Sequence, residues 1–127
     1  MRTLLDTSVL LGPSPGPLDG ELAISTISLA ELHLGVLMTS SAAVRAERLR
    51  RLGVVERTFS ALPVDATVAR HYGRLAAAVA AAGRHPRVRA TDLLIAATAV
   101  THGARLYTRN AGDFLGIEEY VEVLALS

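Results

Sequence analysis

Short apolar runs alternate along this chain with longer stretches that have the periodicity of a helix. Residues 3–11 form an apolar run that only three polar residues interrupt, which is typical of a buried parallel strand ending in a polar turn. Residues 12–17 contain three prolines and two glycines and are expected to form a loop. Residues 22–27 follow as a short second strand. The pattern therefore opens like the first half of an α/β unit.

The rest of the chain continues this alternation. Residues 93–100 are apolar on every face of a helix, so this segment is expected to be buried. The expected helices span residues 28–38, 42–58, 65–82 (with Asp65 as N-cap and Gly83 as terminator) and 92–102 (ending at Gly103); the remaining strands span 104–108 and 120–126, 62–64 is a short extended connection, and 84–89 is a basic loop. This order predicts an α/β fold: a three-layer α/β/α sandwich with a mainly parallel central sheet, in one domain covering residues 1–127.

Composition narrows the functional classes. With 127 residues, half of them hydrophobic, the chain is long enough to bury a core, which at 4% aromatics must consist mostly of Ala, Leu and Val. The lack of Cys excludes disulfides, thiol catalysis and zinc–cysteine sites. Neither a secretory leader nor an apolar run of 18 residues is found, so we expect a cytoplasmic protein without a membrane anchor.

The net charge of +1 conceals a strong asymmetry. Residues 45–109 hold 12 of the 13 basic residues and four acids, a local balance of +8, which suits a polyanionic partner or a set of solvated helix faces. All basic residues are Arg. A Walker A phosphate loop and Schiff-base chemistry both require Lys, so both are excluded.

Four acidic residues lie at junctions between expected elements. They are Asp6, at the end of the first strand; Glu31, near the start of the helix from residue 28; Asp92, at the start of the buried helix; and Asp113, in the turn after residue 109. In an α/β sheet such positions converge on one crevice. Carboxylates held together repel one another unless a proton or cation joins them. The pattern therefore suggests a site for a hard divalent metal.

Each acid also has a purely structural interpretation. Asp6 suits an Asx-turn, and Ser28 with Glu31 forms the spacing of a capping box. A helix dipole favours Asp92 in the first helical turn. Asn110 and Asp113 are common turn residues. Their joint occurrence in this order is what favours a site.

Four stretches together resemble the PIN-domain family, and within it the VapC-type toxins of bacterial toxin–antitoxin pairs. The matching stretches are residues 4–10 (LLDTSVL), 28–35 (SLAELHLG), 91–99 (TDLLIAATA) and 106–114 (LYTRNAGDF). They occur in family order and span nearly the whole chain. The resemblance implies a metal-dependent endoribonuclease that hydrolyses RNA phosphodiester bonds.

In this family an acidic cluster binds magnesium or manganese. Carried over to this sequence, the metal ligands are Asp6, Glu31 and Asp92, and the catalytic residues are these three with Asp113. Asn110 is the other candidate for the fourth position. Thr7 or Ser8 is also expected to reach the site. Glu31 is expected to orient the attacking water. Because carboxylates suit Mg²⁺ and Mn²⁺ alike, the metal identity stays open.

Partners follow from the same resemblance. The arginines expected to contact the RNA backbone are Arg109, Arg84, Arg87 and Arg89. VapC-like toxins are usually inhibited by a VapB-type antitoxin, whose tail lies across the acidic groove, and commonly form homodimers. The apolar face of the helix over 28–38 is a candidate wall of that groove.

Other functional classes are weighed against the nuclease. A PIN-like module that binds RNA or protein without cleavage is the main alternative, although all three principal acids are present. A phosphotransfer protein with Asp6 as nucleophile would need a second Asp at position 8, which is Ser, or a Lys. A structural protein without a site would leave all four acids to caps and turns.

Overall fold

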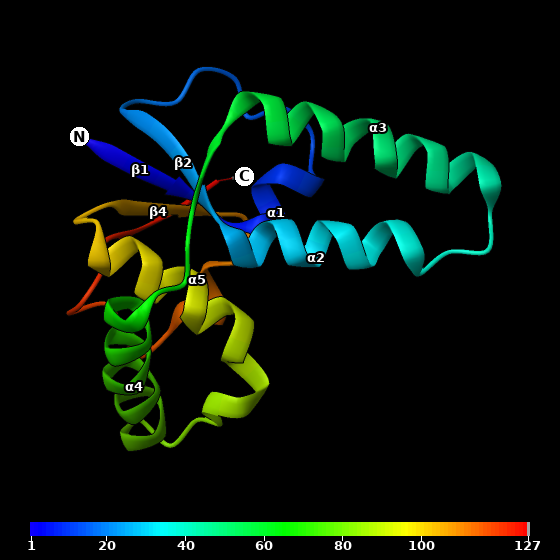
Figure 1. The fold of residues 1–127 in the computed structure, drawn as a ribbon. Helices are drawn as coiled ribbons and strands as arrows, with labels where there is room; N and C mark the ends of the chain where they lie inside the picture. The colour runs from blue at the N-terminus through cyan, green and yellow to red at the C-terminus, as the bar shows by residue number, and fades with distance from the viewer. Residues whose placement is uncertain (127) are drawn as a thin grey trace.

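The computed structural model describes residues 1–126 and contains a central sheet in which every neighbouring pair of strands is parallel (Figure 1). The strands are β1 (Arg2–Leu5), β2 (Glu21–Ser25), β3 (Ser60–Leu62), β4 (Arg105–Thr108) and β5 (Val123–Ala125), in the spatial order β3-β2-β1-β4-β5. The helices are α1 (Thr7–Leu11), α2 (Thr26–Leu37), α3 (Ala42–Thr58), α4 (Ala66–Ala81) and α5 (Ala90–Thr101), with short 3-10 helices η1 (Pro86–Arg89) and η2 (Ala111–Phe114). The predicted fold class is confirmed.

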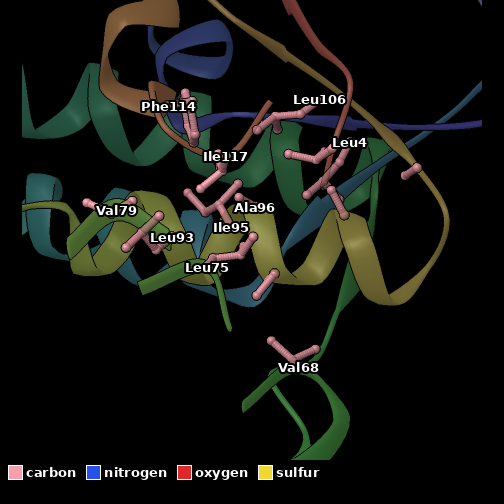
Figure 2. Packing of buried hydrophobic residues seen from close by; sticks show 14 of the residues in the cluster. Leu4, Val68, Leu75, Val79, Leu93, Ile95, Ala96, Leu106, Phe114 and Ile117 are labelled. Carbon is pink, nitrogen blue, oxygen red and sulfur yellow. The ribbon is translucent and has the colours of Figure 1, made fainter. Parts of the chain in front are cut away.

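Alternation along the strands divides the core between the two faces of the sheet. In β1, Leu4 packs with residues of α4 and α5, whereas Leu5 packs with residues of α1, α2 and α3. The first cluster includes Leu93, Ile95 and Phe114, all fully buried, and Figure 2 shows them among the buried side chains that surround α5. The helices thus form a layer on each face, and α5 is buried as its composition predicts.

The strand order places the carboxyl ends of β1 and β4 next to each other in the middle of the sheet. From the central pair β1 and β4 the sheet is extended to one side by β2 and β3 and to the other by β5. Leu5 pairs with Tyr107, so Asp6, which follows β1, lies beside Thr108, the last residue of β4. This is the switch point where ligands bind in open α/β sheets.

Helices α2 and α3 pack against each other as a long hairpin that extends beyond the sheet (Figure 1). Its outer part buries little, and Leu37 and Met38 are 73% and 72% exposed. Along residues 1–126, no helix is at once long and apolar enough to cross a membrane.

Element boundaries differ from the predictions in several places. The strand β3 (Ser60–Leu62) was expected only as an extended connection over 62–64, and α5 begins at Ala90 instead of Asp92. The first strand ends just before Asp6, as predicted, but residues 7–11 form the helix α1, which was not expected. Helix α2 begins at Thr26 instead of Ser28, and its N-cap is Ser25. The final strand is shorter than 120–126, and part of the basic loop 84–89 is the 3-10 helix η1.

Two other expectations hold closely. The helix over 42–58 has the predicted bounds. Asp65 caps α4, and its Oδ1 accepts a hydrogen bond of 3.0 Å from the Val68 amide.

Candidate active site

Asp6 is the buried centre of the site, with only 4% of its surface exposed. Its Oδ2 accepts two hydrogen bonds, from Ser8 Oγ at 2.7 Å and from Thr108 Oγ1 at 2.8 Å. Although Asp6 is the N-cap residue of α1, its side chain makes no capping hydrogen bond to the backbone. The Asx-turn explanation therefore fails. Two hydroxyl groups from separate elements instead fix one carboxylate oxygen at the carboxyl edge of the sheet.

The two hydroxyls are themselves held by the turn after β4. Ser8 Oγ accepts from the Arg109 amide at 3.0 Å, and Thr108 Oγ1 accepts from the Asn110 amide at 2.9 Å. Each hydroxyl thus donates a hydrogen bond to Asp6 and accepts one from a backbone N–H. This network ties the orientation of Asp6 to the conformation of residues 108–110.

Glu31 joins the site through Thr7. Thr7 Oγ1 donates to Glu31 Oε1 at 2.6 Å, so in its 2.8 Å contact with Ser28 Oγ it must be the acceptor. The capping box expected for Ser28 and Glu31 is wrong, because the N-cap of α2 is Ser25, whose Oγ accepts from the Ile27 amide. Ser28 is buried in the first turn and orients Thr7. The predicted involvement of Thr7 thus has a geometric basis.

Asp92 is the acid whose pKa is affected by the charges of the other three. It lies in the first turn of α5 and is partly buried. Burial, together with the negative charges of Asp6, Asp113 and Glu31, raises the pKa of Asp92 to about 6, while Arg89 opposes this shift. Burial is the largest of these causes, and the three carboxylates are close enough to Asp92 for their charges to add to it.

Asp113 is paired with a cation from the chain itself. Arg89 Nη1 donates to Asp113 Oδ1 at 2.7 Å, and the two side chains are 30% and 34% exposed. Asn110 is exposed and contributes its backbone amide to Thr108. Of the two residues considered for the fourth position, Asp113 is therefore the one whose side chain contributes to the field at Asp92.

The other arginines predicted to contact RNA border different segments around the site. Arg84 Nη2 donates weakly to the Gly112 carbonyl at 3.5 Å, and Arg87 is exposed in η1. The Arg109 side chain turns toward the loop after α1, where its Nη2 donates to the Pro13 carbonyl at 2.5 Å. Arg89 and Arg84 therefore border the turn that carries Asp113, and Arg109 borders the loop 12–17.

Two arginines missed by the sequence analysis lie beside Glu31. Arg48 and Arg51 on α3 donate to the carbonyls of Gly35 and Leu11, respectively. They line a cavity of about 230 Å³, whose full lining is Leu11, Glu31, Leu32, Gly35, Arg48 and Arg51. A neighbouring hollow of about 500 Å³ continues along α3 past Val44. Only the packing of α3 against α1 and α2 reveals these arginines, so no sequence motif could have identified them.

The donor chemistry of the site fits a hard cation, although its side chains are not gathered around one point. Carboxylates are the ligands that Mg²⁺ and Mn²⁺ prefer, and the pKa of Asp92 is raised first by burial and then by neighbouring negative charges that a cation would offset. In the described part of the chain, no group of three or more acidic or His side chains is arranged to hold a metal ion.

Comparisons with known proteins place this site in a family. The family model described as PIN domain matches residues 3–118, a stretch that contains all four acids. The chain belongs to the PIN-domain family. This PIN domain is 38% identical to the protein named Ribonuclease VapC5 of Mycobacterium tuberculosis over 121 residues, covering 91% of this chain and 87% of the relative. It is 34% identical to Ribonuclease VapC4 of the same organism, covering 98% of this chain and 97% of the relative.

Solved structures agree with this assignment. The PIN domain is similar to a chain in the crystal structure of VapBC-5 from Mycobacterium tuberculosis, described as a member of the VapBC family of toxin–antitoxin systems, with a TM-score of 0.84, 33% identity and coverage of 98% and 97% of the two chains. A chain in the structure of FitAcB from Neisseria gonorrhoeae matches with a TM-score of 0.79 and 29% identity, with coverage of 98% and 96%.

Proposed function

We propose that this PIN domain is the toxin of a toxin–antitoxin pair, a magnesium- or manganese-dependent endoribonuclease that hydrolyses RNA phosphodiester bonds. The observation that carries the proposal is the hydrogen-bonded placement of Asp6 and Glu31 at the switch point of the sheet, near Asp92, whose pKa is raised by burial and then by the charges of these two acids and Asp113. The similarity to proteins named ribonuclease VapC supports the reaction class.

Asp6 and Asp92, with Glu31, would hold the divalent ion. When bound, the ion would supply Lewis acidity toward the phosphate and toward the attacking water. A Mg²⁺ or Mn²⁺ site needs ionised carboxylates, so Asp92, with its pKa of about 6, must lose its proton before it can contribute. Metal binding and cleavage should therefore increase as pH rises through about 6.

Two carboxylates are prepared for different tasks by their hydroxyl partners. Asp6 is fixed by Ser8 and Thr108 and is suited to a ligand that does not move. Glu31 is bound by Thr7 at Oε1, so Oε2 is the oxygen that would orient the water and accept its proton. Asp92 and Glu31 come from different helices, so the substrate phosphate would lie between α2 and α5.

The RNA is expected to lie across basic residues on either side of these acids. Arg84, Arg87 and Arg89 border the turn that carries Asp113, and Arg48 and Arg51 border Glu31. Contacts of this kind to phosphates position an RNA strand without reading its sequence. The identity of the RNA and of the cleaved bond therefore depends on surface contacts outside the acidic cluster.

A VapB-type antitoxin is the proposed protein partner. The structural relative VapBC-5 is described as a member of the VapBC family of toxin–antitoxin systems, and the α2–α3 hairpin of this chain exposes apolar side chains such as Leu34, Leu37 and Met38. An exposed apolar surface of this kind suits a protein partner. A homodimer is proposed on family resemblance.

The deciding experiment is cleavage of total RNA by the purified chain with Mg²⁺ or Mn²⁺ and with EDTA. The Asp6→Asn variant, purified in the same way, controls for contaminating ribonuclease. We expect metal-dependent fragments that disappear in the variant while its circular dichroism spectrum stays unchanged. Equal cleavage by both proteins would refute the site. Absence of cleavage together with retained RNA binding would favour a non-cleaving PIN-like binding module.

A further inference from the structure

The ion pair between Arg89 and Asp113 joins two segments that are far apart in the sequence. Arg89 is the last residue of η1 and the N-cap of α5, three positions before Asp92. Asp113 lies in η2, after the carboxyl end of β4. Their 2.7 Å contact therefore links the start of α5, which carries Asp92, to the turn that follows β4.

This pair changes the charge of the site. Asp6 and Glu31 accept hydrogen bonds from neutral hydroxyl groups, whereas Asp113 accepts one from a guanidinium group. An arginine in contact with one carboxylate cancels about as much charge as that carboxylate adds. Asp113 is thus a member of the cluster whose negative charge is already compensated within the chain.

We propose that Arg89 is a built-in counter-ion that keeps Asp113 out of the metal-ligand set of the resting site, so that Asp6, Glu31 and Asp92 alone bind a first divalent ion. This inference rests on the proposed metal-dependent function and deepens it. Arg89 is a positioning residue: it acts on the metal through Asp113. A second ion gains Asp113 as a ligand only when Arg89 moves away from it.

The geometry of the pair suits such an exchange. A charge-assisted contact of 2.7 Å is strong enough to hold Asp113 in place. Both side chains are nevertheless about one-third exposed, so water can replace either partner and the pair adds little to the stability of the fold. Arg84, the other basic residue at this turn, contacts a backbone carbonyl and leaves the carboxylate charge unchanged.

The test is a double-mutant cycle that measures Mn²⁺ binding without cleavage. Electron paramagnetic resonance of free Mn²⁺ gives the affinity and the number of bound ions for the wild-type protein, Arg89→Gln, Asp113→Asn and the double variant. Arg87→Gln is the matched control, because Arg87 is an exposed arginine of the same 3-10 helix and its loss changes the net charge equally.

We expect Arg89→Gln to bind Mn²⁺ roughly three- to tenfold more tightly at low ionic strength, or to gain a second ion, because Asp113 becomes available and a nearby positive charge is lost. Asp113→Asn should bind more weakly, since it leaves Arg89 unpaired. The double variant and Arg87→Gln should remain within about twofold of wild type. Tighter binding distinguishes this role from a structural one, because damage to the fold would weaken binding.

The inference is overturned if Arg89→Gln binds Mn²⁺ no more tightly than Arg87→Gln while circular dichroism shows that both variants are folded. If the wild-type protein still shows metal-dependent cleavage, the proposed nuclease function stands and only the role of Arg89 is lost. Conversely, tighter binding in Arg89→Gln without RNA cleavage by any of the proteins supports the counter-ion and contradicts the nuclease.

Discussion

At the scale of single residues, the ionised form of Asp92 is needed for metal binding in the proposed function but lowers the stability of the metal-free fold. Its pKa in the folded protein is about 6, above the ordinary value of 3.8, so the folded protein retains this proton in a range where the unfolded chain has lost it. Stability without metal therefore falls as pH rises from about 4 to about 6, and the loss is complete above that range.

Asp92→Asn should remove this loss. In EDTA at pH 7.5 we expect its free energy of unfolding to exceed that of wild type by roughly 1–3 kcal/mol, reduced by the helix-dipole contribution of about 0.3–1 kcal/mol that the charge supplied. At pH 4 the two proteins should differ little. Urea unfolding followed by circular dichroism measures both values. A variant that is less stable than wild type at pH 7.5 would contradict the electrostatic picture.

The hydroxyls on Asp6 Oδ2 carry a second prediction. Thr108→Val removes one donor and leaves the Asn110 amide without its side-chain acceptor. We expect kcat for RNA cleavage to fall roughly 10- to 100-fold, with KM changed by less than about threefold, because metal-site geometry depends on such outer partners. Thr108→Ser should restore activity, since it retains the hydroxyl.

Thr101→Val is the matched control for this substitution. Its hydroxyl also bonds a backbone group, the Ala97 carbonyl within α5, but lies outside the network on Asp6. Normal kcat in Thr101→Val beside reduced kcat in Thr108→Val would assign the effect to Asp6. Equal losses in both would indicate general damage to α5 and the sheet.

At the scale of elements, the sequence predicted long helices well and short ones poorly. The helix over 42–58 and the Asp65 cap follow from local periodicity and capping, which act within a few residues. The helix α1 over residues 7–11 was not predicted, because a short apolar run fits a buried strand and a buried helix equally. Ser28 matches a capping box in sequence, yet the helix starts two residues earlier, at Thr26.

The site divides along the same line. The acids Asp6, Glu31, Asp92 and Asp113 were identifiable, because motif order and strand ends place them at one edge. Their hydrogen-bond partners were not. Thr108 is 102 positions from Asp6, and Arg51 is 40 positions from Leu11, so only tertiary packing brings each pair together.

Helix α3 provides a third prediction. Arg48→Ala with Arg51→Ala, in an Asp6→Asn background that prevents cleavage, should weaken binding of single-stranded RNA about tenfold at low salt. The slope of log affinity against log salt should fall by about 1.4, because two phosphate contacts are lost. Fluorescence anisotropy of a labelled RNA, measured over a range of salt concentrations, provides both quantities.

Arg70→Ala with Arg74→Ala is the control for α3, because both residues are exposed on α4 and the change in net charge is the same. An equal loss in this control would mean that RNA binding depends on overall charge rather than on the cavity beside Glu31. Thermal unfolding of both variants must remain close to wild type, since Arg48 and Arg51 also fasten α3 to the carbonyls of Gly35 and Leu11.

At the scale of the whole molecule, metal binding and folding should be linked through pH. The acidic site lies where the two halves of the sheet and both helical layers meet, so an ion that joins its carboxylates connects α2 and α5 to the strand ends. Any ligand that binds only the folded state stabilises it in proportion to RT ln(1 + [L]/Kd). Mn²⁺ at ten times its Kd should therefore raise Tm by roughly 5 °C for a chain of this size.

The size of that shift should depend on pH in a direction opposite to the stability of the metal-free protein. Below about pH 6 Asp92 holds a proton that Mn²⁺ must displace, so the same Mn²⁺ concentration should give a smaller shift at pH 5.5 than at pH 7.5. Differential scanning calorimetry with Mn²⁺ and with EDTA at both pH values measures it. A shift that is equal at both pH values, or that persists in Asp92→Asn, would place the ion elsewhere on the molecule.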